Sequence, residues 1–288
     1  MLKIELLESF IAIAECGNLS KAADKICRTQ SALSLQVKKL EESVGKSLLI
    51  RDNKGVTLTE SGETLLIYAY KMMQLNSQAL DELKEGQNHE VIRLGVPTDF
   101  IKCYLNSFLL EFIREFTTIE LVIDTDVSGN LFKRLHQGEF DVIVATHWQL
   151  PTNGELLFTR RFHWVAAAKG NAHQRKTFPV GLYPENCPIR AQVFANHQLS
   201  MRPIKVLLST PSPEALCMAV ENDLVVAPVA EFRINDQMQI LDPIEYGLPP
   251  LPVFNESLYL NPDTQTPATI QLINLIKANV ERKGYKLY

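Results

Sequence analysis

Polar and basic side chains gather near the N-terminus, and their types suit contacts with a nucleic acid. Between residues 21 and 51 the chain carries seven Lys and Arg against three Asp and Glu, a local charge of +4. Amide and hydroxyl groups lie among these cations; they can bond base edges while the cations meet phosphates. Taken by itself, such a charge run is more often a solvated helix surface. The periodicity of the apolar residues therefore has to decide between the two interpretations.

The apolar spacing of the first 45 residues predicts three short helices. Apolar residues recur every three or four positions from Ile4 to Ala14, and Gly17-Asn18 is expected to end this first helix. Ser20 is the predicted N-cap of a second helix, whose small contact residues Ala22 and Ala23 permit close crossing. A third helix is predicted over 31–44, before Gly45. This is helix-turn-helix geometry, in which the later helix enters the major groove.

The outward side of the third helix holds the side chains with base-reading chemistry. Gln30 and the nearby serines can bond base edges or phosphates, and Leu35 can pack on a thymine methyl. After Gly45, stretches 47–51 and 56–59 predict a hairpin-like wing around Asn53-Lys54-Gly55. The wing would place the charges of Arg51 and Lys54 beside the duplex backbone.

Residues 59–86 contain no Pro and predict one long helix. Its apolar stripe can pack on its own domain or pair with a second helix, and the length of the helix favours pairing. A two-fold dimer would read two half-sites of double-stranded DNA. The predicted dimerisation stripe is Leu65, Tyr68, Met72, Leu75, Ala79 and Leu83.

From residue 91 onward, short β-rich runs alternate with helical stretches. Strands are predicted at 91–96, 120–125, 141–145, 163–168, 205–208 and 224–229, and helices at 102–116, 130–137, 213–221 and 268–282. This alternation indicates an α/β fold with a parallel-rich sheet covered by helices. Ligands of such folds bind beyond the C-terminal ends of strands.

The N-terminal 65 residues resemble the winged helix-turn-helix of LysR-type transcriptional regulators. The resemblance implies DNA contacts from Gln30, Ser31, Ser34 and Gln36, and a wing contact to phosphate from Arg51. Leu35 departs from the family, which usually has a long polar residue there. The matching residues are Asn18-Leu19-Ser20-Lys21-Ala22-Ala23, Thr29-Gln30-Ser31-Ala32-Leu33-Ser34, Val37-Lys38-Lys39-Leu40-Glu41, Gly45, Leu48, Arg51 and Leu58-Thr59-Glu60-Ser61-Gly62. The full set of expected DNA-binding residues is Ser20, Lys21, Gln30, Ser31, Ser34, Leu35, Gln36, Lys38, Lys39, Arg51 and Lys54.

The C-terminal region resembles the effector domain of the same family, with looser motifs. These are Ile92-Arg93-Leu94-Gly95, Leu131 with Leu135, Gly138-Glu139-Phe140-Asp141-Val142, and Val220 with Asp223-Leu224-Val225-Val226-Ala227-Pro228. The resemblance implies a two-lobed periplasmic-binding-protein-like α/β domain over 89–288. It would follow a DNA-binding domain at 1–58 and a linker helix and hinge at 59–88. The Leu182-Tyr183-Pro184-Glu185 run suggests the LrhA/HexA/PecT-like branch. Family members are often tetramers, so either a homodimer or a homotetramer is expected.

The same resemblance places a small-molecule effector in a cleft lined from both lobes. A carboxylate at Asp99 would disfavour a simple carboxylate effector and tolerate a polar, amine-bearing or hydroxylated one. Each of the expected residues can instead be a capping or turn residue. The expected effector residues are Thr98, Asp99, Ser128, Thr146, His147, Ser209, Thr210 and Ser212.

Composition and absent motifs narrow the function classes. The 29 Lys and Arg against 33 Asp and Glu give a net charge of −4, and no long apolar run predicts a membrane span. Five scattered cysteines and no signal-peptide pattern indicate a cytoplasmic protein. No phosphate loop, nucleophile elbow or metal-ligand spacing occurs, so we expect neither an enzyme nor a cofactor.

Three functional hypotheses remain open. The first is a DNA-binding transcriptional regulator whose C-terminal domain senses a small molecule. The second is a regulator of the same architecture with a redox switch at Cys103, Cys187 or Cys217. The third is a solute-binding protein with a fused N-terminus, against which the lack of a signal peptide argues.

Overall fold

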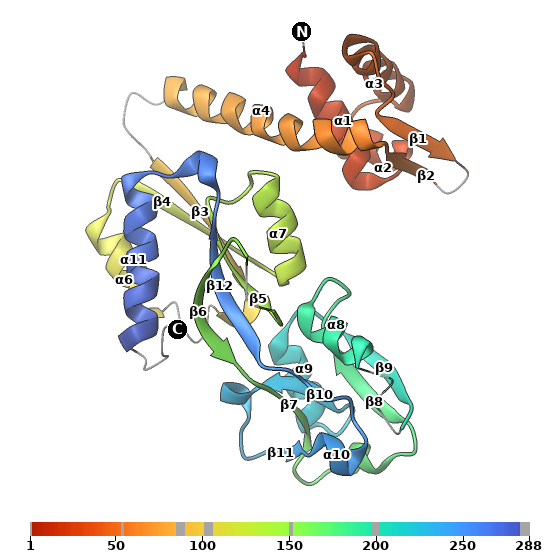
Figure 1. Cartoon of the computed structure of the whole chain (residues 1–288), viewed down its shortest axis with the longest axis vertical. Coiled ribbons are helices and arrows are strands. Elements are labelled where there is room, and N and C mark those ends of the chain that lie inside the picture. The colour runs from red at the N-terminus through yellow and green to blue at the C-terminus, as the bar shows by residue number, and fades with distance from the viewer. Residues whose placement is uncertain are drawn as a thin grey trace. The chain divides into compact units, whose positions relative to one another are not determined.

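The computed structural model of the chain describes residues 2–52, 55–84, 90–100, 106–149, 152–196, 198 and 202–282 (Figure 1). The chain divides into two compact units. One is Met1–His89 with His136–Glu139, and the other is Glu90–Leu135 with Phe140–Tyr288.

Three short helices, α1 (Ile4–Cys16), α2 (Leu19–Lys25) and α3 (Gln30–Val44), begin the first unit. Gly17 ends α1 with a φ of 58°, a left-handed conformation that glycine adopts at no steric cost. The N-cap of α2 is Asn18 and not Ser20 as predicted, because the Asn18 side chain accepts hydrogen bonds from the Ser20 and Lys21 amides. The crossing of α2 on its neighbours buries Ala22 and Ala23.

The wing and the long helix complete this unit. Strands β1 (Leu49–Asp52) and β2 (Gly55–Leu58) pair antiparallel, and α4 spans Glu60–Lys84. The inner face of α4 buries Ala69 in the core formed by α1, α2 and α3. The Tyr70 hydroxyl donates to Glu15 on α1 at 2.7 Å, which ties the helix further to that core.

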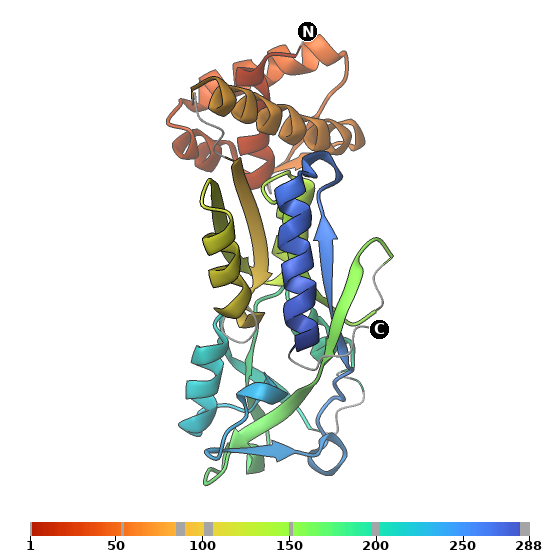
Figure 2. The ribbon, with the colours of Figure 1, turned by 90° about the vertical axis from the view of Figure 1, so that its left-hand side faces the viewer.

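The second unit has two lobes (Figures 1 and 2). Lobe I is built on a five-stranded sheet in the order β4-β3-β5-β12-β6. Strands β3, β4 and β5 are parallel, and β12 runs antiparallel to both of its neighbours. The strands are β3 (Glu90–Pro97), β4 (Ile119–Asp126), β5 (Val142–His147), β6 (Glu155–Arg160) and β12 (Phe254–Leu260).

Helices cover both faces of the lobe I sheet. Helices α6 (Asn106–Glu115) and α11 (Pro267–Arg282) lie side by side over one apolar core, which includes Phe112 and Leu272 (Figure 2). Helix α7 (Ser128–His136) packs Leu131 and Leu135 on the other face (Figure 1). The one-turn helix α5 (Thr98–Phe100) follows β3 directly.

Lobe II holds the antiparallel sheet β10-β7-β11 and the parallel pair β8-β9. An isolated bridge between Val180 and Val226 links the two sets. The elements are β7 (Phe162–Ala167), β8 (Phe178–Leu182), β9 (Ile204–Ser209), β10 (Ala227–Ala230), β11 (Met238–Leu241), α8 (Pro188–Ala195), α9 (Pro213–Glu221) and α10 (Pro243–Tyr246).

The chain passes between the lobes at two neighbouring places. A single residue, Arg161, separates β6 of lobe I from β7 of lobe II. The return segment, which includes Leu251–Val253, leads into β12, and Phe254 at its start pairs with Arg160 at the end of β6. These two crossings therefore lie side by side.

The predicted α/β fold class is confirmed, with four strands that the sequence analysis did not predict, β6, β8, β11 and β12. The sheets are mixed, because β12 inserts antiparallel between β5 and β6. No helix within the described residues is long and apolar enough to cross a membrane.

Candidate nucleic-acid interface and ligand cleft

Helix α3 presents polar side chains to solvent along the face opposite its buried Leu33, Val37 and Leu40. Thr29 is the N-cap of this helix, since its hydroxyl accepts a hydrogen bond from the Ala32 amide. The exposed residues include Gln30, Ser31, Lys38 and Lys39 on α3 and Ser20 and Lys21 on α2. The N-terminal turn of α3 and the adjoining end of α2 therefore share one polar surface.

Two hydrogen bonds hold candidate DNA-contacting side chains in place. The Gln30 amide donates to the Ser20 hydroxyl at 2.5 Å, and joins α3 to α2. The Arg51 guanidinium on the wing donates to Ser34 at 2.9 Å. The wing cation is therefore anchored to the helix beside it.

Other predicted DNA-binding residues fall into different environments. Leu35 is 53% exposed and is an apolar side chain on an otherwise polar face. The Gln36 carbonyl instead accepts from the buried Ser9 hydroxyl at 2.5 Å, so this side chain faces α1. Lys38 lies 4.0 Å from Glu42. Lys54 lies outside the described residues.

The predicted stripe on α4 divides between two faces. Leu65 and Met72 are half-buried against the core of their own unit. Tyr68, Leu75 and Leu83 are 57%, 64% and 83% exposed, and Ala79 is exposed as well. The sequence analysis missed Ile67 and Leu80, which are also exposed. Exposed apolar side chains gathered on one helix are a feature of surfaces that bind other proteins.

A small cavity of about 30 Å³ lies between the lobes. That volume accommodates one or two water molecules. Lobe I contributes residues that follow its strands, and lobe II contributes Tyr183, Cys187 and the prolines that flank Ser212. The lining residues are Pro97, Thr98, Asp99, Asp126, Val127, Ser128, Thr146, Arg160, Phe162, Tyr183, Cys187, Ile189, Pro211 and Pro213.

Two of the lining residues, Asp99 and Arg160, also belong to a group of buried charges. We call this group, Asp99, Arg160, Arg233 and Glu256, the charge cluster. Asp99 of lobe I accepts from Arg233 of lobe II at 2.5 Å and lies 3.8 Å from Arg160. The Arg160 guanidinium also donates to Glu256, whose side chain is fully buried. Two carboxylates and two guanidiniums balance to zero, which is how proteins retain buried charge.

The charge cluster has spare hydrogen-bonding capacity. Within the described part of the chain, Arg233 Nη2 and Glu256 Oε2 are buried without a hydrogen-bond partner. Burial raises the pKa of the Glu256 carboxyl, and the Arg160 guanidinium beside it opposes this shift. Burial lowers the pKa of Arg233, but the Asp99 and Glu214 carboxylates outweigh it and raise the pKa. The charge cluster, two of whose members line the cavity, therefore holds unsatisfied atoms of both signs.

The structure brings together half of the predicted effector residues. Thr98, Asp99, Ser128 and Thr146 line the cavity, and the Ser128 hydroxyl accepts from the Thr146 amide at 2.8 Å. His147 does not line it, because successive strand residues face opposite sides and the His147 ring packs against Phe132 at 4.8 Å. Burial lowers the His147 pKa.

The predicted residues before α9 also lie outside the cavity lining. Ser212 caps α9 by accepting from the Ala215 amide, and the Thr210 hydroxyl accepts from the Ser212 amide. Ser209 is exposed at the end of β9. These three residues shape the turn into α9, while Pro211 and Pro213 reach the cavity.

Sequence reasoning missed the strongest polar groups of the cleft. Arg160 ends a strand that was not predicted, and Glu256 lies inside another one. Arg233 follows β10, and its partner Asp99 lies 134 residues away in sequence. The available signal was Glu256, the single charged residue of the stretch 247–262, since such a residue is buried only when paired.

Cys187 and Cys217 lie in settings that disfavour reactivity. Burial raises the pKa of the Cys187 thiol to about 11 and also raises that of Cys217. Thiols with a raised pKa hold little thiolate, the reactive form. Cys103 lies outside the described residues. No cluster of three His, Cys, Asp or Glu in the described ranges has the arrangement of a metal site.

The charge cluster makes a stability prediction. Arg160→Met leaves the Glu256 carboxylate buried without its guanidinium, so we expect a loss of about 3–5 kcal/mol in unfolding free energy. Urea unfolding followed by tryptophan fluorescence measures it. The double variant Arg160→Met/Glu256→Leu removes both charges and is expected to recover most of the loss. A double variant no more stable than Arg160→Met would contradict the pairing.

Comparison with known proteins identifies both parts of the chain. Residues 4–63 match the model for the bacterial regulatory helix-turn-helix protein of the lysR family, and residues 85–281 match the LysR substrate binding domain. PecT of Dickeya dadantii (strain 3937) is 27% identical over 96% of this chain and 87% of its own length. DgdR of Burkholderia cepacia is 28% identical over 89% of this chain and 87% of its own length. Both are named HTH-type transcriptional regulators.

Solved structures share the fold. Full-length OxyR of Pseudomonas aeruginosa has a TM-score of 0.52 at 18% identity, and covers 98% of this chain and 95% of its own. DarR of Vibrio fischeri, solved in complex with DNA, has a TM-score of 0.50 at 20% identity over 96% of this chain and 99% of its own. The likeness to PecT agrees with the branch suggested by residues 182–185. The two family matches span nearly the whole chain, which belongs to the LysR family of DNA-binding, effector-responsive transcriptional regulators.

Proposed function

We propose that α3 and the wing read promoter DNA through Ser20, Lys21, Gln30, Ser31, Ser34, Leu35, Lys38, Lys39 and Arg51. The observation that carries this proposal is the shared polar face of α2 and α3, with the wing cation Arg51 bonded to Ser34. Exposed Leu35 offers an apolar contact for a thymine methyl. Gln36 contributes through its bond to Ser9, which fixes α3 on α1.

The exposed face of α4 is proposed to hold two copies of the chain together. Tyr68, Leu75 and Leu83 would be covered by the same face of a second helix, which forms a two-fold interface. Two reading heads then engage two half-sites, and the second contact gains from the effective concentration set by the first. A pair of such dimers would give the homotetramer. The proposed domains are the DNA-binding domain at 1–58, the linker helix and hinge at 59–88, and the effector-binding domain at 89–288.

The cleft between the lobes is proposed as the effector site. Its cavity of about 30 Å³ is too small for a metabolite, so the lobes must part before a ligand enters. Parting separates Asp99 from Arg233 and exposes charges of both signs. An effector that replaces those contacts pulls the equilibrium toward the open form, as differential binding requires.

No catalytic role is part of this proposal, and a cytoplasmic location suits a protein that binds DNA. A redox switch is the second candidate among the sequence hypotheses. The raised pKa values of Cys187 and Cys217 speak against these two thiols as sensors.

The DNA contacts predict two distinguishable phenotypes. Arg51→Ala should weaken binding to every sequence by a similar factor, since a phosphate contact carries no sequence information. Gln30→Ala should relax base preference, because an amide that meets a base edge discriminates by about 1–3 kcal/mol. Gel-shift titrations over a range of salt concentrations measure both. If Arg51→Ala changed the base preference and Gln30→Ala did not, the assignment of Arg51 to phosphate and Gln30 to a base edge would be wrong.

The α4 interface predicts that Leu75→Glu breaks the assembly. Leu75 is 64% exposed in a single chain, so a carboxylate there does not disturb the fold but is desolvated when two helices pair. Light scattering should give the Leu75→Glu variant a molar mass of half the wild-type value or less. Thr64→Glu, at an exposed polar position on the same helix, is the control. Equal masses for Leu75→Glu and the wild type would exclude this face.

The cleft predicts a hydroxyl-dependent effector. A thermal-shift screen of small metabolites against the full chain should find a compound that raises the melting temperature, since a ligand at 100 times its Kd stabilises by about 2.7 kcal/mol. Thr98→Val removes only the hydroxyl at the cavity wall and should reduce that effect. Thr64→Val serves as the control. A stabilising compound insensitive to Thr98→Val binds elsewhere.

A further inference from the structure

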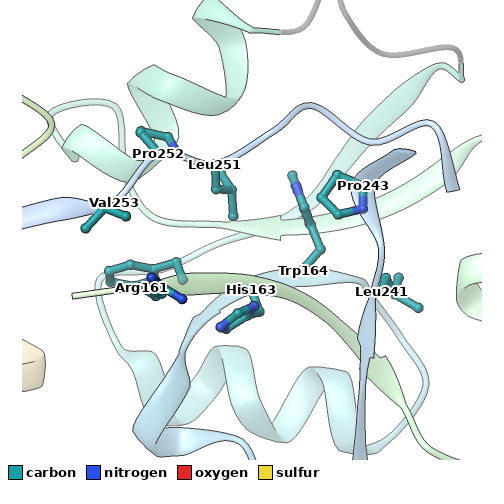
Figure 3. A pocket seen from close by; sticks show the side chains of 9 residues that line it. Arg161, His163, Trp164, Leu241, Pro243, Leu251, Pro252 and Val253 are labelled. Atoms are coloured by element: carbon teal, nitrogen blue, oxygen red, sulfur yellow. The ribbon is translucent and has the colours of Figure 1, made fainter. Parts of the chain in front are cut away.

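Lobe II contains a second cavity, separate from the cleft between the lobes (Figure 3). Its volume is about 240 Å³, and it lies between β7 and the segment that runs from β11 to β12. Strand β11 ends at Leu241, opposite Trp164, so it leaves the earlier part of β7 uncovered on that side. The lining residues are Arg161, Phe162, His163, Trp164, Leu241, Pro243, Leu251, Pro252 and Val253.

The walls of this cavity are apolar apart from the side chains of Arg161 and His163. The Trp164 indole N–H donates to the Pro249 carbonyl at 2.8 Å, so the ring presents only its apolar surface. Leu251 points from the opposite segment toward β7, beside Trp164 (Figure 3). A dry cavity of about 150 Å³ holds benzene, and drug-sized ligands need about 300 Å³ or more. The intermediate size of this one suits a single ring or a short branched chain.

One cation is available at the cavity. Arg161 is exposed, and no carboxylate of the described residues pairs with it. The ring of His163 lies on the other side of the β7 ribbon from Trp164 (Figure 3). The lining residues include no Asp or Glu. Asp242, which stands in sequence between the lining residues Leu241 and Pro243, accepts from the Ile244 and Glu245 amides. The charge at the cavity is therefore positive at the Arg161 end.

We propose that this lobe II cavity binds a small monocarboxylate with an aromatic or branched aliphatic body. The body packs against Trp164 and Leu251, where it leaves water, and the carboxylate meets the Arg161 guanidinium. Charge-assisted bonds of guanidinium to carboxylate are among the strongest polar contacts in proteins, and they fix orientation as well as affinity. This site is additional to the proposed effector cleft and does not depend on it.

The position of the cavity gives such a ligand access to both connections between the lobes. Arg161 is the residue that joins β6 to β7, and Leu251–Val253 belong to the returning segment. The neighbouring residue Arg160 and the β12 residue Glu256 belong to the charge cluster. A ligand held between the two connections stiffens the path that the lobes use to move, and so couples this cavity to the cleft by linkage.

Isothermal titration of the full chain with phenylacetate and 3-methylbutanoate tests the proposal without DNA. Both probes should bind, and Arg161→Gln should weaken binding at least tenfold. Lys205→Gln removes an exposed charge elsewhere in lobe II and should leave the affinity within twofold. The neutral analogue 2-phenylethanol should bind the wild type at least tenfold more weakly than phenylacetate. Absence of binding by both probes, or equal affinity for Arg161→Gln, overturns the proposal.

A second variant locates the ligand. Leu251→Trp fills the cavity and should abolish binding of phenylacetate, while Leu224→Trp, at a 59% exposed position in the same lobe, should leave it unchanged. Circular dichroism checks that both variants are folded. If Leu251→Trp does not fold, Arg161→Gln still decides. Retained affinity in a folded Leu251→Trp variant places the probe elsewhere and overturns the proposal.

Discussion

A buried charge in a protein must find an opposite charge, and this requirement organises the second unit. Arg160 and Glu256 meet where the two connecting strands lie side by side, in a space closed to water. Asp99 and Arg233 extend the pairing from one lobe to the other. Removing either guanidinium leaves the carboxylates in excess, so the arrangement of the lobes and the geometry of their connections are set together. The proposed opening of the lobes requires these ion pairs to rearrange.

Local signals in the chain predicted the first unit well. The apolar spacing of α1 and α3 needs only neighbouring residues, and Gly17 and Gly45 end these helices where expected. The N-cap of α2 shifted from Ser20 to Asn18, because an asparagine carbonyl two residues earlier reaches two amides. Helix α4 shows the limit of such reasoning, since one apolar stripe serves two surfaces. Leu65 and Met72 pack on their own unit, whereas Leu75 and Leu83 stay exposed.

The cleft could be predicted only in part, and the reason is distance along the chain. Thr98 and Ser128 follow strands with clear β patterns, so the rule that ligands lie beyond strand ends located them. Arg160 and Glu256 are 96 residues apart, and Asp99 and Arg233 are 134 apart. No periodic pattern reports such partners. His147 was placed in the cleft because it ends β5, but strand alternation turns its ring toward Phe132 and Tyr259.

The bonds between Gln30 and Ser20, and between Arg51 and Ser34, also bear on how the protein searches a genome. Before any DNA arrives, one donor of each of these groups already has a partner, so a DNA contact that uses that donor exchanges one hydrogen bond for another. Such exchanges add little net binding energy. A non-matching site then offers little in return for a broken internal bond, and the protein leaves it quickly. Short residence on wrong sequences, more than tight binding to the right one, is what this arrangement favours.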